Sequence, residues 1–156
     1  NARIKAAAAV PFWRDWILSD DSGLEVAALG GKPGIFSSRF AGEASTDTEN
    51  NLKLLNDMKN VAPGNRKALF RCVAVLVHGN SGNRFTAEGI CEGVITSSPG
   101  GTGGFGYDPI FYIPRFGRTM AELTFEEKMQ ISHRAKALFK IRQQTTETDF
   151  LKAALS

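Results

Sequence analysis

The chain has 156 residues, of which 42% are hydrophobic and 22% charged, with a formal net charge of +3. This is ordinary globular composition, and the length suffices for one domain with a sizeable core. The charge excess is small and no nucleic-acid-binding motif occurs, so we expect no nucleic-acid partner. Because no run of 18 apolar residues occurs and the first residues lack the apolar region of a signal peptide, we expect no membrane association and a cytoplasmic location.

The first part of the chain predicts a helix and two strands. Residues 1–10, NARIKAAAAV, are helix formers, and Pro11 is expected to end that helix. Residues 16–18 are apolar and predict a short buried strand. Residues 19–23, SDDSG, have turn-forming composition and predict an acidic turn. The apolar residues 24–29 predict a second strand, so we expect this turn to connect two strands.

A helix between two turns is predicted next. The glycine-rich residues 30–34 form the first of these turns. The sequence TDTE from Thr46 has the pattern of a capping box, in which side chains bond the first backbone N–H groups of a helix. Leu52, Leu55 and Met58 recur after it at helical spacing and predict the buried face of the helix.

The remaining elements predict a hairpin, a strand and two helices. Two largely apolar stretches, residues 67–79 and 84–96, flank GNSGN, and Asn and Gly tolerate the positive φ of tight turns. Residues 109–114 predict another short strand. Residues 124–144 predict helix, with Ser132 as the cap of the second of two short helices. Interspersed strands and helices with an antiparallel hairpin predict an α/β fold with a mixed sheet and flanking helices.

The two cysteines, Cys72 and Cys91, lie in separate apolar stretches and lack CxxC spacing. His78 and His133 are the only histidines, so the sequence contains no set of zinc ligands. We therefore expect two reduced, buried thiols.

A glycine-rich segment, GGTGGFGYDPIF at residues 100–111, invites comparison with phosphate-binding loops. Gly101, Gly103 and Gly106 match GxGxxG, but a dinucleotide site needs a helix directly after the motif, and here strand-forming residues follow. No GxxxxGK[ST] phosphate loop occurs in the chain. Neither of the usual phosphate-binding explanations therefore applies.

Two interpretations of this glycine segment stay open from its residues alone. One is a flexible surface loop, which glycine runs commonly form. The other is a nucleobase pocket. In such a pocket the glycines bring backbone close to the ligand, the ring of Phe105 stacks on a flat base, and Asp108 accepts from the N–H groups of the base.

Asp20 and Asp21, with Glu25 nearby, offer the oxygen ligands that Mg²⁺ prefers. A carboxylate of this kind also orients or deprotonates a water molecule. Adjacent residues of an extended chain point to opposite sides, so we expect no more than one of the two aspartates to enter a site directly. The alternative is an ordinary turn without a catalytic role.

Lys128 and Ser132 are four residues apart and share a helix face, while His133 and Arg134 stand at a helix start. A solvated basic face is one interpretation. The other is base recognition, because Lys and Arg only donate hydrogen bonds. They would accept a 6-keto purine and reject the 6-amino group of adenine.

Four separated segments together closely resemble the inosine triphosphate pyrophosphatase family, also described as XTP/dITP diphosphatases. They are residues 20–42, 101–111, 123–128 and 132–138, in the order found in that family. The resemblance implies a homodimeric, Mg²⁺-dependent hydrolase that converts ITP, dITP and XTP to the monophosphate and pyrophosphate, and so cleanses the nucleotide pool. It also implies an elongated α/β fold with two lobes around a cleft that holds the active site.

The resemblance assigns roles to individual residues. Asp21 corresponds to the catalytic carboxylate and metal ligand, with Asp20 beside it as a further metal ligand. The implied reaction is in-line attack of a metal-assisted water, oriented by Asp21, without a covalent intermediate. The other positions correspond to substrate-binding residues of the family: Lys5 at the phosphates, Ser22, the base-binding Phe105, Gly106, Tyr107 and Asp108, the substrate lysine Lys128, and His133 with Arg134 as readers of the keto purine.

Members of that family begin with a strand, a loop of the type [ST]xNxxK and an acidic metal ligand ahead of an Asn-Ala pair. The chain begins at this pair, as Asn1 and Ala2, so we expect one pyrophosphatase domain over residues 1–156 that lacks the N-terminal part. Amides and charges at the phosphates stabilise the transition state, so we expect weak or no activity without that part. The alternative function is a noncatalytic nucleotide-binding or oligomerising module.

Overall fold

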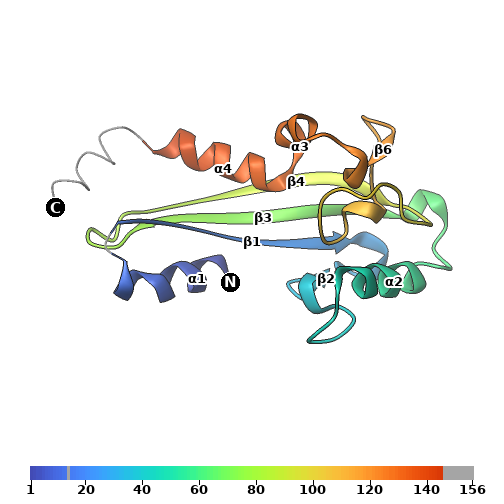
Figure 1. Cartoon of the computed structure of the whole chain (residues 1–156), viewed down its shortest axis with the longest axis horizontal. Coiled ribbons are helices and arrows are strands. Elements are labelled where there is room, and N and C mark those ends of the chain that lie inside the picture. The colour runs from blue at the N-terminus through green and yellow to red at the C-terminus, as the bar shows by residue number, and fades with distance from the viewer. Residues whose placement is uncertain (14, 146–156) are drawn as a thin grey trace. The chain divides into compact units, whose positions relative to one another are not determined.

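The computed structural model describes residues 1–13 and 15–145 (Figure 1). Its α-helices are α1 (Ala2–Ala9), α2 (Asp47–Asp57), α3 (Phe125–Ile131) and α4 (His133–Gln144). Its strands are β1 (Trp16–Val26), β2 (Pro33–Gly34), β3 (Lys67–His78), β4 (Arg84–Ile95), β5 (Phe111–Ile113) and β6 (Arg118–Thr119). The six strands form one sheet in the order β2-β1-β3-β4-β5-β6. None of the helices in the described residues is long and apolar enough to cross a membrane.

The α/β fold class is confirmed, and most elements lie where the sequence predicts them. β3 and β4 are the strands of the predicted hairpin, and Thr46 and Glu49 form the predicted capping box of α2. Ser132 caps α4 by accepting a hydrogen bond from the backbone N–H of Ala135. The pairs β1–β2, β4–β5 and β5–β6 are antiparallel.

One prediction is wrong: residues 19–23 form no turn, because β1 runs without a break through them. The polar side chains of this stretch find partners on neighbouring elements, which offsets their low strand propensity. The hydroxyl of Ser19 donates to the carbonyl oxygen of Ala2 at 2.6 Å, and Asp20 and Asp21 both form ion pairs. Tertiary contacts thus override the turn preference of this composition.

The buried face of α2 also differs from the predicted one. Leu52 is 60% exposed, whereas Leu54 and Met58 are fully buried. Asn50 and Asn51 lie on the buried side as well, although both side chains are polar. The buried face therefore combines apolar side chains with two asparagines that need hydrogen-bond partners.

Contacts within the chain divide it into two compact units. The first unit comprises residues 1–21, residues 72–90 and the described residues from 132 onward. The second unit comprises residues 22–71 and 91–131. Each unit has buried apolar clusters of its own, which supply its cohesion.

In the first unit, α1 and α4 cover opposite faces of the sheet (Figure 1). Ala6 of α1 belongs to the same buried cluster as Val75 of β3. Ala137 of α4 instead clusters with Cys72 and Ala74 of β3. Odd and even residues of a strand point to opposite faces, so the two helices pack on different sides of β3.

The core of the second unit is centred on the fully buried ring of Phe111 in β5. Its centroid lies 4.5 Å from that of Phe70. A Cβ atom at Gly93 would lie 2.6 Å from the Phe111 ring, so the absence of a side chain lets this ring pack against β4. Cys91 is buried in this core and Cys72 in the first unit, and neither of them forms a disulfide, as predicted.

Candidate active site

The structure gathers the predicted site residues into two groups, one in each unit. The first group, the strand cluster, comprises Lys5, Asp20, Asp21, His133 and Arg134 of the first unit. The second group, the loop cluster, comprises Phe105, Gly106, Tyr107, Asp108 and Lys128 of the second unit. Ser22 follows Asp21 on β1 and is the first residue of the second unit.

Asp21 is paired with Lys5 in the strand cluster. The Oδ1 atom of Asp21 lies 2.8 Å from Nζ of Lys5, and this Nζ also donates to the carbonyl oxygen of Asp20 at 3.2 Å. The Lys5 side chain is 58% exposed, so the pair adds little stability. An ammonium group has three hydrogens, and among the described residues two of them are used on β1. The third is available to an anion from solvent.

Asp20 pairs with a different cation. Its Oδ2 atom lies 3.0 Å from both Nε and Nη2 of Arg134, and Sγ of Cys72 lies 3.8 Å from the same oxygen. Lys5 belongs to α1 and Arg134 to α4, which cover opposite faces of the sheet. The carboxylates of Asp20 and Asp21 therefore point to opposite faces, as their adjacent positions on a strand require.

This arrangement limits how the strand cluster could hold a metal ion. Within residues 1–13 and 15–145, no three His, Cys, Asp or Glu side chains form a group that could bind a metal. The structure also does not bring the carboxylates of Asp20 and Asp21 together. Mg²⁺ commonly uses one or two carboxylates with waters and substrate phosphates. Either carboxylate could act as the single ligand in that pattern, because both are partly open to solvent and each is paired with one cation.

His133 begins α4 and is nearly buried. A Cβ atom at Gly89 would lie 2.0 Å from the carbonyl oxygen of His133, so glycine allows the first turn of α4 to approach β4 closely. Burial lowers the pKa of His133 to about 4, and the positive charge of Arg134 acts in the same direction. The imidazole is therefore neutral at pH 7, which leaves the positive charge at this helix start to Arg134.

The glycine segment is held by backbone hydrogen bonds at several points. The N–H of Gly100 donates to the carbonyl of Pro109 at 2.8 Å, and the N–H of Gly103 donates to that of Ala121 at 3.1 Å. The hydroxyl of Thr119 donates to the carbonyl of Gly100 at 2.8 Å. These hydrogen bonds hold the backbone of Gly100 and Gly103 in place, which argues against a flexible surface loop.

A nearly buried ion pair stands beside this segment. Oδ2 of Asp108 lies 3.0 Å from Nζ of Lys128 and accepts the N–H of Phe105 at 3.4 Å. A Cβ atom at Gly104 would lie 2.0 Å from the same oxygen, and φ there is +82°, so the site requires glycine. The Phe105 ring itself is 61% exposed. A fixed backbone therefore presents an open aromatic face, which base stacking needs.

Tyr107 serves as an anchor of the loop cluster. It is 3% exposed, and its hydroxyl donates to the carbonyl oxygen of Ser37 at 2.9 Å. Burial raises the pKa of Tyr107, and the negative charge of Asp47 adds to the effect. The phenol is therefore protonated throughout the physiological range, and it donates to the backbone.

Two residues of this cluster were missed from the sequence, both on α2. Asp47 accepts the N–H of Gly106 at 2.6 Å, and Asn51 donates from Nδ2 to the carbonyl of Gly106 at 2.9 Å. A signal exists in hindsight. Positions 47, 51, 54 and 58 form one helical stripe, so two polar residues extend the apolar face of Leu54 and Met58.

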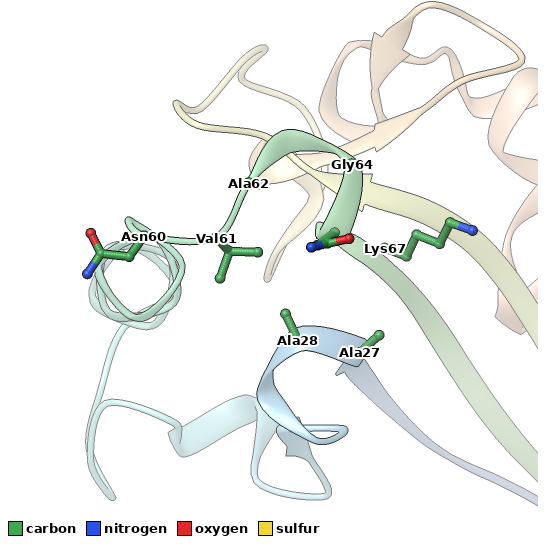
Figure 2. Close-up of a pocket in the computed structure, with 8 residues that line it drawn as sticks. Ala27, Ala28, Asn60, Val61, Ala62, Gly64 and Lys67 are labelled. Atoms are coloured by element: carbon green, nitrogen blue, oxygen red, sulfur yellow. The ribbon is translucent and has the colours of Figure 1, made fainter.

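The pocket drawn in Figure 2 lies elsewhere in the second unit. Its volume is about 670 Å³, and it is lined by Ala27, Ala28, Asn60, Val61, Ala62, Gly64, Asn65 and Lys67. None of the predicted site residues lines it. Its lining has one lysine but no carboxylate or imidazole, so the loop cluster and the strand cluster remain the two candidate sites.

Comparisons with known proteins show the family of the chain. Residues 1–144 match the model of the Ham1 family. The dITP/XTP pyrophosphatase of Desulforamulus reducens is 54% identical over 140 residues, which cover 90% of this chain and 69% of that protein. The dITP/XTP pyrophosphatase of Geobacillus kaustophilus is 49% identical over 148 residues, covering 94% and 72%. The solved structure of a HAM1 protein from Coxiella burnetii is similar with a TM-score of 0.84 and 43% identity, covering 91% of this chain and 73% of that one. The chain belongs to the Ham1 family.

Proposed function

We propose that the protein hydrolyses deaminated purine nucleoside triphosphates (ITP, dITP and XTP) to the monophosphate and pyrophosphate. One observation carries the proposal: the loop cluster presents the exposed ring of Phe105 on a backbone that hydrogen bonds hold in place. Relatives that are about half identical bear the name dITP/XTP pyrophosphatase, which supports the same activity. A noncatalytic nucleotide-binding module is not favoured, because these relatives are named as enzymes.

The loop cluster is assigned to the base. A purine stacks on Phe105, and Lys128 keeps two further hydrogens for a keto oxygen beside the one that it gives to Asp108. The amino group of adenine is a donor and would face another donor there, which disfavours it. Following the resemblance, His133 and Arg134 are assigned to the recognition of keto purines.

Within the strand cluster, Asp21 and Lys5 are assigned to the phosphates. Asp21 orients a water molecule and accepts its proton as the water oxygen bonds to the phosphorus that joins the monophosphate to pyrophosphate. The bond from that phosphorus to the leaving pyrophosphate oxygen breaks at the same time. Lys5 offers its third hydrogen to a phosphate oxygen, and Ser22 is a further substrate contact. No covalent intermediate is needed.

Magnesium is the proposed cofactor, held by Asp21 together with oxygens of the substrate. When bound, it supplies positive charge that offsets the charge developing on the phosphate oxygens. Asp20 is not assigned to the same ion, because its carboxylate points to the other face of β1. The donor set of one carboxylate and several phosphate oxygens suits a hard cation.

A homodimer in the cytoplasm is proposed on the resemblance. Ile35 and Phe36 of the second unit are 66% and 52% exposed, which supports an apolar contact surface. Sedimentation of the protein should show a mass of two chains, and Phe36→Ser should lower it. A single-chain mass at micromolar concentration would count against the dimer.

The activity is tested by pyrophosphate release from ITP, XTP, GTP and dATP, each with and without Mg²⁺. Release, even where it is weak, should favour ITP and XTP over dATP and should require Mg²⁺. Calorimetry with inosine monophosphate runs in parallel. Inosine monophosphate that binds while no triphosphate is cleaved would instead support the noncatalytic module.

A further inference from the structure

Two side chains of helix α2 form hydrogen bonds with one glycine of the loop cluster. The Oδ2 atom of Asp47 accepts the N–H of Gly106 at 2.6 Å. The Nδ2 atom of Asn51 donates to the carbonyl oxygen of the same residue at 2.9 Å. Both polar groups of one peptide residue are thus bound by side chains of one helix, and we name Asp47 and Asn51 the α2 bracket.

The chemistry of the α2 bracket matches the backbone that it holds. Asp47 and Asn51 are four residues apart and share a helix face. A carboxylate only accepts and so suits the N–H, while the amide nitrogen only donates and so suits the carbonyl. Gly106 has φ of +60°, a conformation that the two bonds hold in place. A residue with this conformation reverses the chain locally and so sets the direction of its neighbours.

One of those neighbours is the proposed stacking residue. Phe105 precedes Gly106, and Tyr107 follows it with its hydroxyl bonded to the carbonyl of Ser37. The Phe105 ring is 61% exposed, so most of its surface faces solvent and the backbone contributes to its direction. Its orientation depends on the backbone, which is bonded at Phe105 by Asp108 and at Gly106 by the α2 bracket.

Asn51 lowers the stability of the fold at its position, which is unexpected for a residue with a purely structural role. The residue is 7% exposed, and its Oδ1 atom is buried without a hydrogen-bond partner among the residues that the structure describes. A buried acceptor without a partner lowers stability, and an apolar side chain of similar size would avoid that penalty. Residues that lower stability are expected at functional positions.

We propose that Asp47 and Asn51 are positioning residues that hold Gly106 and thereby fix the Phe105 ring for stacking on the purine base. The inference rests on the proposed function, because it presumes that Phe105 binds a base. It makes no use of the strand cluster, so its effects should be confined to base binding.

The direct test is hydrogen exchange of the Gly106 amide, followed by NMR on the whole chain. Asp47→Ala removes the acceptor, and we expect the exchange of this amide to speed up about tenfold. Asp47→Asn keeps an acceptor oxygen at the same place and should largely restore protection. An exchange rate that neither substitution changes would overturn the inference.

The functional test separates KM from kcat in pyrophosphate release from ITP. Asp47→Ala and Asn51→Ala should raise KM about tenfold with little change in kcat, because a bracket acts on binding in the ground and transition states alike. Asp47→Asn should stay within about threefold of the wild type. Binding of pyrophosphate alone should be unchanged in all three variants.

A matched control comes from the neighbouring residue Asn50. It is also buried on α2, but it bonds the backbone of Ser38 and Ala41 and the hydroxyl of Ser45. Asn50→Ala should lower the melting temperature without changing KM or the exchange of the Gly106 amide. Asn51→Leu should show the opposite, with an unchanged or higher melting temperature and a raised KM.

The outcomes distinguish the two levels of the proposal. Phe105→Ala is the marker for the proposed function and should itself raise KM. If Phe105→Ala raises KM while the bracket variants do not, the bracket inference fails and the proposed function stands. If Phe105→Ala leaves KM unchanged, the base-stacking assignment fails and the bracket inference fails with it. A raised KM in the bracket variants that merely tracks their melting temperatures, as in Asn50→Ala, would also overturn it.

Discussion

The strand cluster and the loop cluster hold their carboxylates in opposite ways. On β1, Asp20 and Asp21 are partly exposed and each pairs with a cation from a helix on its own face. In the loop cluster, Asp108 is nearly buried. It accepts a hydrogen bond from the backbone N–H of Phe105 and forms an ion pair with Lys128. The arrangement of the strand cluster therefore depends on ion pairs, and that of the loop cluster depends on close packing and on the conformation of its backbone. Changes of charge should therefore disable the first, and changes of volume or backbone the second.

The largest expected effect is that of Asp21→Asn on turnover. Loss of a general base typically slows a reaction about 10²- to 10⁴-fold, so kcat for ITP should fall within that range. Asp20→Asn is the matched control, because it removes the same charge from the opposite face of the strand. We expect it to lower kcat by no more than about tenfold. Equal losses in the two variants would contradict the assignment of Asp21.

The next effect is a pH dependence of the free energy of unfolding that comes from His133 in the strand cluster. Burial lowers the pKa of His133 in the folded state to about 4, below the ordinary value of about 6.5. The unfolded chain therefore binds a proton first as pH falls, and stability should decrease from pH 6.5 down to pH 4 by up to about 3 kcal/mol. Above pH 6.5 His133 contributes no pH dependence.

Urea unfolding at pH 7 and pH 4.5 measures this effect. His133→Gln removes the titrating group, so the loss of stability between the two pH values should shrink. An identical loss in both proteins would show that other groups are responsible.

A smaller effect concerns shape in the loop cluster. Gly104→Ala places a Cβ atom 2.0 Å from Oδ2 of Asp108 at φ of +82°, and should cost about 2 to 3 kcal/mol of unfolding free energy. Gly106→Ala has a similar φ of +60° but open space around its Cβ, and should cost about 1 kcal/mol. Equal costs by chemical denaturation would mean that the space beside Asp108 is not limiting.

The smallest effect is that of Phe105→Ala on stability, with Phe111→Ala as its contrasting control. Phe105→Ala should change the free energy of unfolding by less than about 0.5 kcal/mol, because its ring is 61% exposed. Phe111→Ala removes a fully buried ring, and should cost about 3 to 5 kcal/mol. A large loss of stability in Phe105→Ala would show that this ring packs in the folded chain and is not reserved for a ligand.

Local signals in the sequence predicted much of the fold. The hairpin turn at residues 79–83, the capping box at Thr46 and the cap at Ser132 act through neighbours along the chain, and all three are confirmed. The composition of residues 19–23 misled, because the bonds that keep them extended come from α1 and α4. Propensity describes a residue without such partners.

The sequence indicated which residue types belong to the candidate site, but it did not indicate most of the contacts between them. Phe105 and Asp108 follow from residue type, since a ring stacks and a carboxylate accepts. Asp47 and Asn51 contact Gly106 across 59 and 55 residues of sequence. The helical stripe places them on one face of α2, but no local pattern predicts which backbone groups they bond. The opposite directions of Asp20 and Asp21 were predicted from their adjacency along the chain, and their ion pairs with α1 and α4 confirm them.

The division of labour between the clusters is tested most directly by crossed binding of inosine and pyrophosphate to two variants. Phe105→Ala should weaken inosine binding at least about tenfold and leave pyrophosphate binding unchanged, because stacking contributes about 1 to 3 kcal/mol per base. Lys5→Ala should weaken pyrophosphate binding in the presence of Mg²⁺ and leave inosine binding unchanged. A variant that weakens both ligands equally, or the reverse pattern, would contradict the account.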